Sequence, residues 1–230
     1  MRRIAIGFVM LVVCADALSA QRRIPSVRGQ EPSIWITGGA GLFTGNGVND
    51  GRSGSVWDFG NATNFQYRGS LEKTIGTQSS IGLTGTYVRV PFTYRSSTLV
   101  PPGGGASCGS CEAHLDMMTL SLGVHIGGGV GFHQVIEGNA GVVRYTSLKR
   151  ESDGAELAPR TGNVDPIFSA GYGFGYGFNE RTTINLVQDY GIALHEKTGL
   201  ANGERNTNSV RTLRFSLRFG FGSRAAVRRR

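Results

Sequence analysis

The sequence predicts an all-β protein, an eight-stranded antiparallel up-and-down transmembrane β-barrel with short periplasmic turns and long extracellular loops. Three observations lead to this prediction. Eight segments of about ten residues alternate apolar and polar positions. The links between these segments alternate between short and long, and the chain starts with a secretory signal. No later stretch approaches the roughly 20 apolar residues of a transmembrane helix.

The secretory signal sets the domain organisation. "MRR" is a positive n-region, "IAIGFVMLVV" a short apolar h-region, and "ADALSA" supplies small residues for cleavage after Ser19 or Ala20. A lipoprotein signal at Cys14 is less favoured, because the bulky Val13 precedes it. We therefore predict four parts. They are a signal peptide (1–20), a periplasmic N-terminal segment (21–32), a β-barrel (33–222) and a basic C-terminal tail (223–230).

Composition narrows the functional class. Only 17% of the 230 residues are charged, against about 25% in typical soluble domains. The chain contains 36 glycines without a collagen period, and its net charge is +8. Its basic residues are interspersed with acidic ones and form no stripe, so we expect no nucleic-acid partner.

The stretch "NFQYRGSLEKT" (64–74) shows the alternation most clearly, and "RTLRFSLRFGFG" (211–222) repeats it. Successive side chains of a strand point to opposite faces, so each segment has one apolar and one polar face. The apolar faces hold Phe65, Tyr67, Gly69 and Leu71 in the first and Leu213, Phe215, Leu217, Phe219 and Phe221 in the second. The other six expected strands are 33–43, 80–90, 116–126, 134–145, 167–178 and 182–193.

The connections give the barrel its expected orientation. Long links fall at 44–63, 95–114, 146–165 and 194–208, and short links at 75–79, 127–133 and 179–181. Outer-membrane barrels have short periplasmic turns and long extracellular loops. An even number of strands with a long link first places both chain ends on the periplasmic side.

The stretch "AGYGFGYGF" (170–178) alternates rings with glycines and suggests which face meets lipid. In a membrane barrel the rings face hydrocarbon and its boundary, while the glycines leave room in the lumen. We expect the same lipid-facing orientation for Leu71, Leu83, Leu122, Phe174 and Phe215. A soluble lipocalin-like barrel alternates too, with its apolar face inward. The scarcity of charge on the polar face favours the membrane barrel.

The polar faces predict a charged lumen. Its expected polar network consists of Arg68, Glu72, Glu137, Asp189, Arg214 and Arg218, accompanied by Gln66, His125, Asn139 and Asn185. Charges of both signs in a narrow interior should pair, because an unpaired buried charge is very costly. The network is either a structural plug or a gated pore or proton-linked site. Since side chains can fill an eight-stranded barrel, its width favours the plug.

The segments 64–74, 170–178 and 211–222, together with the signal peptide, resemble the small eight-stranded outer-membrane barrels of the OmpA-transmembrane-domain and OmpX-like group. The resemblance covers about residues 33 to 222 and implies an architecture, not an activity. In that group the last strand commonly ends the barrel with an aromatic residue that the assembly machinery reads. Here Phe219 and Phe221 occupy that zone, but "GSRAAVRRR" follows.

The motif "CGSC" predicts a disulfide between Cys108 and Cys111, because the exported chain meets an oxidising compartment. A zinc site needs two more ligands, and only His114 is close. A redox motif usually opens a helix, whereas this one lies in a loop. The loop 44–55 lacks the acidic density of a calcium site. We therefore expect no metal site and no cofactor.

These features predict a protein of the cell outer membrane with a structural or surface-binding, adhesion-like role through its loops. Three alternatives are a narrow porin-like channel lined by arginines, a lipid A-modifying barrel enzyme and a secreted lipocalin-like binder. None of the four histidines lies in a His-x-Ser arrangement, so we expect no catalytic residues. Expected partners are outer-membrane lipid and lipopolysaccharide, the barrel-assembly machinery and an extracellular ligand of the loops.

Overall fold

The computed structural model describes residues 31–96, 104–160, 163–202 and 204–223. The predicted signal peptide and most of the basic tail lie outside these residues. The strands are β1 (Ile34–Gly45), β2 (Gly47–Asp50), β3 (Ser55–Asp58), β4 (Asn64–Gly76), β5 (Ser79–Ser96), β6 (Cys111–Ile126), β7 (Gly131–Arg150), β8 (Val164–Asn179), β9 (Thr182–Leu194) and β10 (Thr207–Phe221). Among the described residues there is no helix long and apolar enough to cross a membrane.

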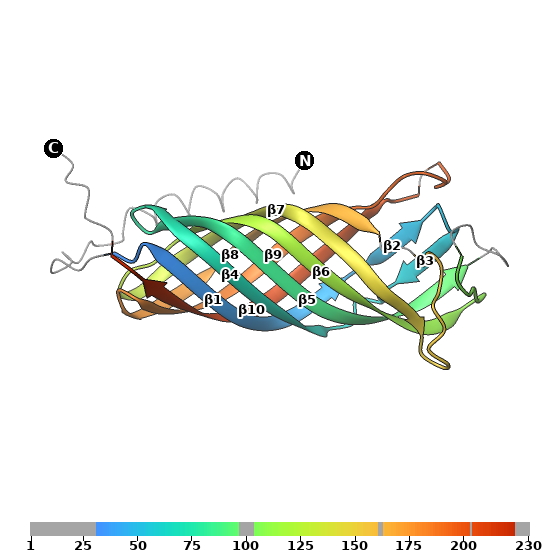
Figure 1. Cartoon of the computed structure of the whole chain (residues 1–230), viewed down its shortest axis with the longest axis horizontal. Helices are drawn as coiled ribbons and strands as arrows, with labels where there is room; N and C mark the ends of the chain where they lie inside the picture. The colour runs from blue at the N-terminus through green and yellow to red at the C-terminus, as the bar shows by residue number, and fades with distance from the viewer. Residues whose placement is uncertain (1–30, 97–103, 161–162, 203, 224–230) are drawn as a thin grey trace, which may run out of the picture.

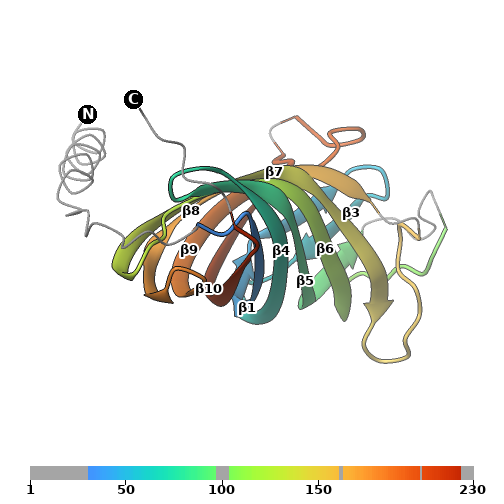
Figure 2. The same ribbon diagram turned by 60° about the vertical axis from the view of Figure 1, so that its left-hand side comes forward.

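Eight of these strands, β1 and β4 to β10, form a closed antiparallel barrel (Figures 1 and 2). Each strand pairs with its neighbours in the chain. The ring closes where β1 pairs with β10, from Ile34 opposite Phe221 to Gly45 opposite Val210. All eight expected segments are strands, and the predicted fold class is confirmed. The start of β1, the end of β10 and the short links lie at one end, which we call the periplasmic end, and β2 and β3 lie at the other, the outer end (Figure 1).

The outer end differs from the expected loops, because the barrel wall continues there. Residues 44–63 are not one open loop. Strand β2 follows β1 after Asn46, and β3 pairs with β5 from Ser55 opposite Ser96 to Asp58 opposite Thr93. The hairpin of β2 and β3 thus extends the sheet beyond the end of β4. Strands β5 and β7 also run past their expected ends, to Ser96 and Arg150.

An apolar belt covers the outside of the barrel. Half or more of the side-chain surface is exposed at Leu71, Leu83, Leu122 and Phe215, at 56, 53, 61 and 55%, and 43% is exposed at Phe174. Apolar groups in this number and arrangement, on the convex face of a closed sheet, need hydrocarbon around them. The soluble lipocalin-like alternative is therefore wrong for this part of the wall, since its apolar face would point inward.

The lumen-facing glycines of β8 explain the ring-and-glycine stretch. A side chain at Gly173 would collide with the carbonyl oxygen of Leu186 and lie 2.7 Å from the Cα of Val187. A side chain at Gly171 would meet the carboxylate of Asp189. Glycine is thus required by close approach of the neighbouring strand and by the lumen residues opposite. The rings on the other face, such as Phe174, point away from the barrel.

Candidate functional site

The lumen of the periplasmic half contains the six predicted polar-network residues, arranged in two clusters. In the first cluster, Arg218 of β10 donates to Glu72 of β4 at 2.7 Å and to Ser80 at 2.6 Å. Both Ser70 and Ser80 also donate to the Glu72 carboxylate at 2.6 Å. The Arg218 guanidinium stacks over the ring of Trp35, 4.2 Å from its centre. Each charge of this cluster is therefore met by a partner of opposite sign.

The second cluster surrounds Glu137 of β7. Its carboxylate accepts hydrogen bonds from Arg214 and, at 2.8 Å, from Arg68. The ring of His125 lies 3.0 Å from the same carboxylate. Arg214 also donates to Asp189 of β9 at 2.7 Å. The two clusters together combine three arginines with three carboxylates, so the network balances its charge without His125.

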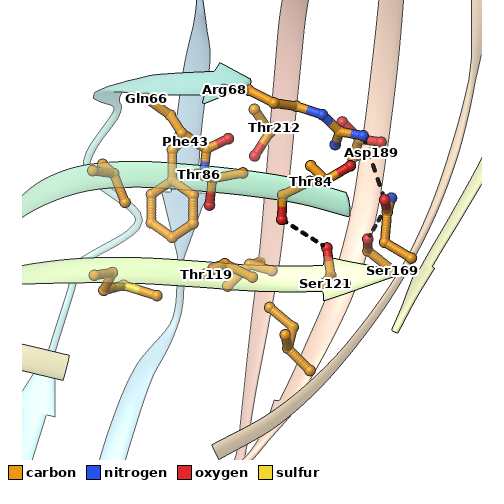
Figure 3. A pocket seen from close by; sticks show the side chains of 16 residues that line it. Phe43, Gln66, Arg68, Thr84, Thr86, Thr119, Ser121, Ser169, Asp189 and Thr212 are labelled. Atoms are coloured by element: carbon orange, nitrogen blue, oxygen red, sulfur yellow. Dashed lines mark hydrogen bonds between the residues drawn. The ribbon is translucent and has the colours of Figure 1, made fainter. Parts of the chain in front are cut away.

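A small chamber with a mixed polar and apolar lining lies beside the second cluster (Figure 3). Its volume is about 60 Å³, which is room for a few ordered waters and not for a permeating solute. Asn139 is one of its lining residues, and its amide lies 3.4 Å from Arg68 and 3.3 Å from the Ser169 hydroxyl. Gln66 lies on its wall, whereas the amide of Asn185 lies lower, beside Gly175 and the ring of His133. The polar lining residues are Gln66, Arg68, Thr84, Thr86, Thr119, Ser121, Asn139, Ser169, Asp189 and Thr212.

Above the chamber, the lumen changes from polar to apolar. A continuous core of buried side chains fills the outer half of the barrel. Trp57 of β3 packs edge-on against Tyr145 at 5.7 Å between ring centres and lies 6.5 Å from Phe92. The members of this outer core are Phe43, Val48, Trp57, Phe59, Val88, Val90, Phe92, Tyr94, Ala113, Leu115, Met117, Val143, Tyr145, Leu157, Ile167, Ala193 and Val210.

One histidine is enclosed in the outer core between two carboxylates. His195, which directly follows β9, donates from Nδ1 to Asp165 at 2.8 Å, and its Nε2 lies 3.5 Å from Asp50. Only 2% of its side chain is exposed. Burial acts to lower the pKa of His195, but the hydrogen bond to Asp165 and the interactions with the charged carboxylates of Asp165 and Asp50 outweigh it and raise this pKa to about 9. The cation ties the β2–β3 hairpin to β8 and β9.

Asp50 is held from both sides. Its carboxylate accepts hydrogen bonds from the Ser53 hydroxyl at 2.5 Å and from the backbone N–H of Arg52 at 3.2 Å. Burial acts to raise the pKa of Asp50, but His195 and these donors outweigh it and keep this pKa below its usual value. Asp50 and His195 therefore form a charged pair inside an apolar environment.

The two cysteines of the mature chain are joined at the outer end. Cys108 and Cys111 form a disulfide across three positions, and both pack against the outer core. The backbone N–H of Ser96 donates to the Cys108 carbonyl at 3.1 Å, and Cys111 pairs with Tyr94 across β5 and β6. The bridge thus fixes the turn from which β6 starts. Within the described residues, no group of three or more His, Cys, Asp or Glu side chains could hold a metal ion.

The sequence reasoning missed the outer core and the His195 cluster. The signal for the core was present, because Val88, Val90, Phe92 and Tyr94 alternate with Arg89, Pro91, Thr93 and Arg95. This alternation places the apolar residues on the face that is polar lower in the same strand. The His195 cluster joins residues from three distant segments, and nothing in the local sequence predicts their meeting.

The arrangement of an outward apolar belt around a closed ring of eight antiparallel strands decides the class. The chain is a small eight-stranded outer-membrane β-barrel. Among solved structures it is similar to Neisserial surface protein A, with a TM-score of 0.52 and 11% sequence identity over 84% of this chain and 100% of that chain. This likeness shows the fold alone.

Two further outer-membrane barrels are similar to it. The outer membrane protein OprG from Pseudomonas aeruginosa gives a TM-score of 0.49 and 13% identity over 85% of this chain and 100% of that chain. The attachment invasion locus protein Ail of Yersinia pestis gives a TM-score of 0.41 and 11% identity over 82% of this chain and 99% of that chain. No protein-family model and no curated protein sequence matches the chain.

Proposed function

We propose that this outer-membrane barrel has a structural or surface-binding role and carries it out through its outer end, with a lumen that does not conduct. The observation that carries the proposal is the double filling of the lumen. A balanced set of ion pairs occupies the periplasmic half, and an apolar core that encloses the paired Asp50, Asp165 and His195 occupies the outer half. A solute would have to displace both.

The channel alternative has less support. A narrow pore would use Arg68, Arg214 and Arg218 as its lining, but each of these arginines is hydrogen-bonded to a carboxylate. The chamber beside them holds only about 60 Å³, and Phe43 and Val88 of the outer core form part of its lining. Opening one ion pair would therefore not connect the two ends of the barrel.

We also expect no enzymatic activity. Nucleophilic catalysis needs a base within hydrogen-bond reach of the nucleophile, on a face that the substrate can reach. His125 and His133 lie in the lumen, and His195 is enclosed between carboxylates. His114 lies at the outer rim, where its ring is 2.8 Å from Glu151. These positions do not favour a lipid A-modifying centre.

The partners follow from the two surfaces of the barrel. The apolar belt requires outer-membrane lipid, and we propose lipopolysaccharide for the outer leaflet around it. The outer end presents charged and polar groups, among them the exposed ion pairs of Arg95 with Asp58 and of Arg150 with Asp153. We propose that a ligand of the cell exterior binds there. The barrel-assembly machinery is the third proposed partner.

Three measurements test the proposed function. Purified protein in planar lipid bilayers should give no discrete conductance steps, and regular steps would overturn the closed lumen. Cells that display the protein should attach to a panel of immobilised matrix proteins and glycans. A variant with the exposed residues 151–154 replaced by a Gly-Ser linker is the matched control for this attachment. Unchanged mass of lipid A in expressing cells would separate this role from the enzyme alternative.

A further inference from the structure

A polar cleft lies on the outside of the barrel wall, at the seam where β1 and β10 close the ring. It is lined by Thr44, Asn46, Asn61, Ser209 and Arg211 and has a volume of about 350 Å³. Pockets that bind small molecules begin at about 300 Å³. The cleft is therefore large enough for a ligand of the size of a sugar, and it does not belong to the lumen.

The two strands of the seam direct these side chains outward. Thr44 and Arg211 are direct partners across β1 and β10, and the backbone N–H of Asn46 donates to the Ser209 carbonyl at 3.2 Å. Strand neighbours such as Val210 are buried inside, so the alternating residues must face outside. Asn61, in the turn between β3 and β4, closes the cleft from above in a left-handed backbone conformation with φ of 53°.

The polar groups of the cleft are unpaired. Within the described part of the chain, none of the five side chains forms a hydrogen bond or ion pair with another residue. The guanidinium of Arg211 lies only over the ring of Tyr190, 5.7 Å from its centre. Two other arginines of the outer end, Arg95 and Arg150, are paired with carboxylates, whereas Arg144 is, like Arg211, exposed and has no carboxylate partner among the described residues. Among the described residues, Arg211 is therefore a cation without an acidic partner beside four neutral polar groups.

The cleft borders the lipid-facing belt directly. Leu42 and Leu213, two residues below Thr44 and Arg211 on the same outer face, are 49 and 43% exposed, and Phe65 opposite Leu42 is 56% exposed. A ligand in the cleft would thus lie at the level of the outer-leaflet headgroups. Aromatic residues at such boundaries present an apolar body and a polar edge to the ligand.

We propose that this cleft binds a sugar that carries an anionic group, such as phosphate or sulfate. Amide and hydroxyl groups both donate and accept hydrogen bonds, which matches the hydroxyl groups of a sugar. Arg211 supplies a bidentate donor for the anion. The sugar belongs either to the headgroup of an outer-leaflet glycolipid or to a free glycan. This inference deepens the proposed surface-binding role and rests on it.

The test uses the full barrel in nanodiscs of zwitterionic phospholipid, with glucose 1-phosphate as the probe. NMR titration should give saturable shifts of the backbone amides of residues 44–46, 61 and 209–211. Uncharged glucose should bind more weakly. The variant Arg211→Gln should weaken binding by about tenfold or more, because it removes a charge-assisted hydrogen bond. The variant Asn46→Ala tests binding to the same cleft without changing its charge.

Arg144→Gln is the matched control, because Arg144 is also an exposed, outward-facing arginine near the outer rim, on β7. It should leave binding unchanged. Equal losses in the two arginine variants, or no saturable shift in the wild type, would overturn the proposal. Nanodiscs that also contain rough lipopolysaccharide distinguish the sources. Blocked binding of glucose 1-phosphate assigns the cleft to a glycolipid headgroup, and unchanged binding assigns it to a free glycan. A conducting barrel would contradict the proposed function without touching this result.

Discussion

In the two halves of this barrel, the apolar side chains of the same strand point in opposite directions, outward in the periplasmic half and inward in the outer half. In the periplasmic half of β5, Leu83 points outward and the lumen beside it is polar. In the outer half, Val90 and Tyr94 fill the lumen, and Arg89 and Arg95 point outward. The medium around the wall explains the reversal, since lipid surrounds one half and water the other. The medium outside each part of a strand thus determines which face of that part is apolar. A membrane barrel can therefore continue beyond the lipid as a barrel of soluble type.

The largest effect should come from breaking the polar half. The variant Glu137→Ala removes the carboxylate that Arg68 and Arg214 share, which leaves the buried Arg68 without a carboxylate and Arg214 with Asp189 alone. We expect the free energy of unfolding in micelles to fall by about 3 to 5 kcal/mol, measured by tryptophan fluorescence in urea. The control Glu151→Ala removes an exposed carboxylate of the outer end and should cost about 0.5 kcal/mol or less. Similar losses in both variants would show that water screens the lumen.

The apolar half should respond to pH through its one enclosed histidine. The pKa of His195 rises from its ordinary 6.5 to about 9 on folding, so the stabilisation is complete below pH 6.5 and is lost as the pH rises through 9. We expect a fall of about 3 kcal/mol in the free energy of unfolding across this range. Asp50, Asp165 and the ring of Tyr145 are the groups that face this histidine. The variant His195→Gln should show no such fall, and equal pH profiles for both proteins would contradict the assignment.

The close packing of the polar half can be tested at one glycine. Gly173→Ala should cost about 1 to 3 kcal/mol, because its new methyl group meets backbone atoms of β9 and not a mobile side chain. Gly138→Ala is the matched control, since its methyl group would point outward with no atom within 4 Å. This control should leave the free energy of unfolding unchanged or slightly higher. If both variants unfold alike, the lumen is looser than the contacts indicate.

The smallest effect should come from the disulfide. Replacing Cys108 and Cys111 together with alanine opens a covalent loop of only a few residues, so the chain-entropy model allows at most about 2 kcal/mol. The change should appear as faster proteolysis near residues 104–110. The heat-dependent shift of the barrel on gels should persist, because neither half of the lumen loses a partner. Loss of that shift would mean that the outer end controls the stability of the whole barrel.

The lipid-facing half of the wall could be predicted from the sequence. Around residues such as Leu71 and Phe215, apolar side chains occupy every second position over the length of a full membrane crossing. The outer half could not be predicted in this way. Strands β2 and β3 have four residues each, too few to show a period. Beyond the membrane, the apolar face also turns inward. In a segment such as 88–94, the apolar residues therefore stand at the positions that are polar in the periplasmic part of the same strand.

The residues of the lumen could be predicted, but their pairing could not. Arg218 and Glu72 are separated by 146 positions, and several arginines and carboxylates share the polar faces. Only the three-dimensional register determines which of them meet. The polar groups of the outer seam were missed for a related reason, because Thr44 and Arg211 become neighbours only when the first and last strands pair.

The position of the arginines on β10 has a consequence for how the ring closes. In the periplasmic half of the lumen, the other strands supply three carboxylates, from β4, β7 and β9, and the single arginine Arg68. The last strand brings both Arg214 and Arg218, four residues apart. A slip of two residues would keep every side chain on its proper face, yet it would move both guanidiniums by about 7 Å along the wall. The ion pairs therefore distinguish between strand registers that are equivalent in their apolar pattern. Pairing of β10 in the correct register is what neutralises the carboxylates in the periplasmic half of the lumen.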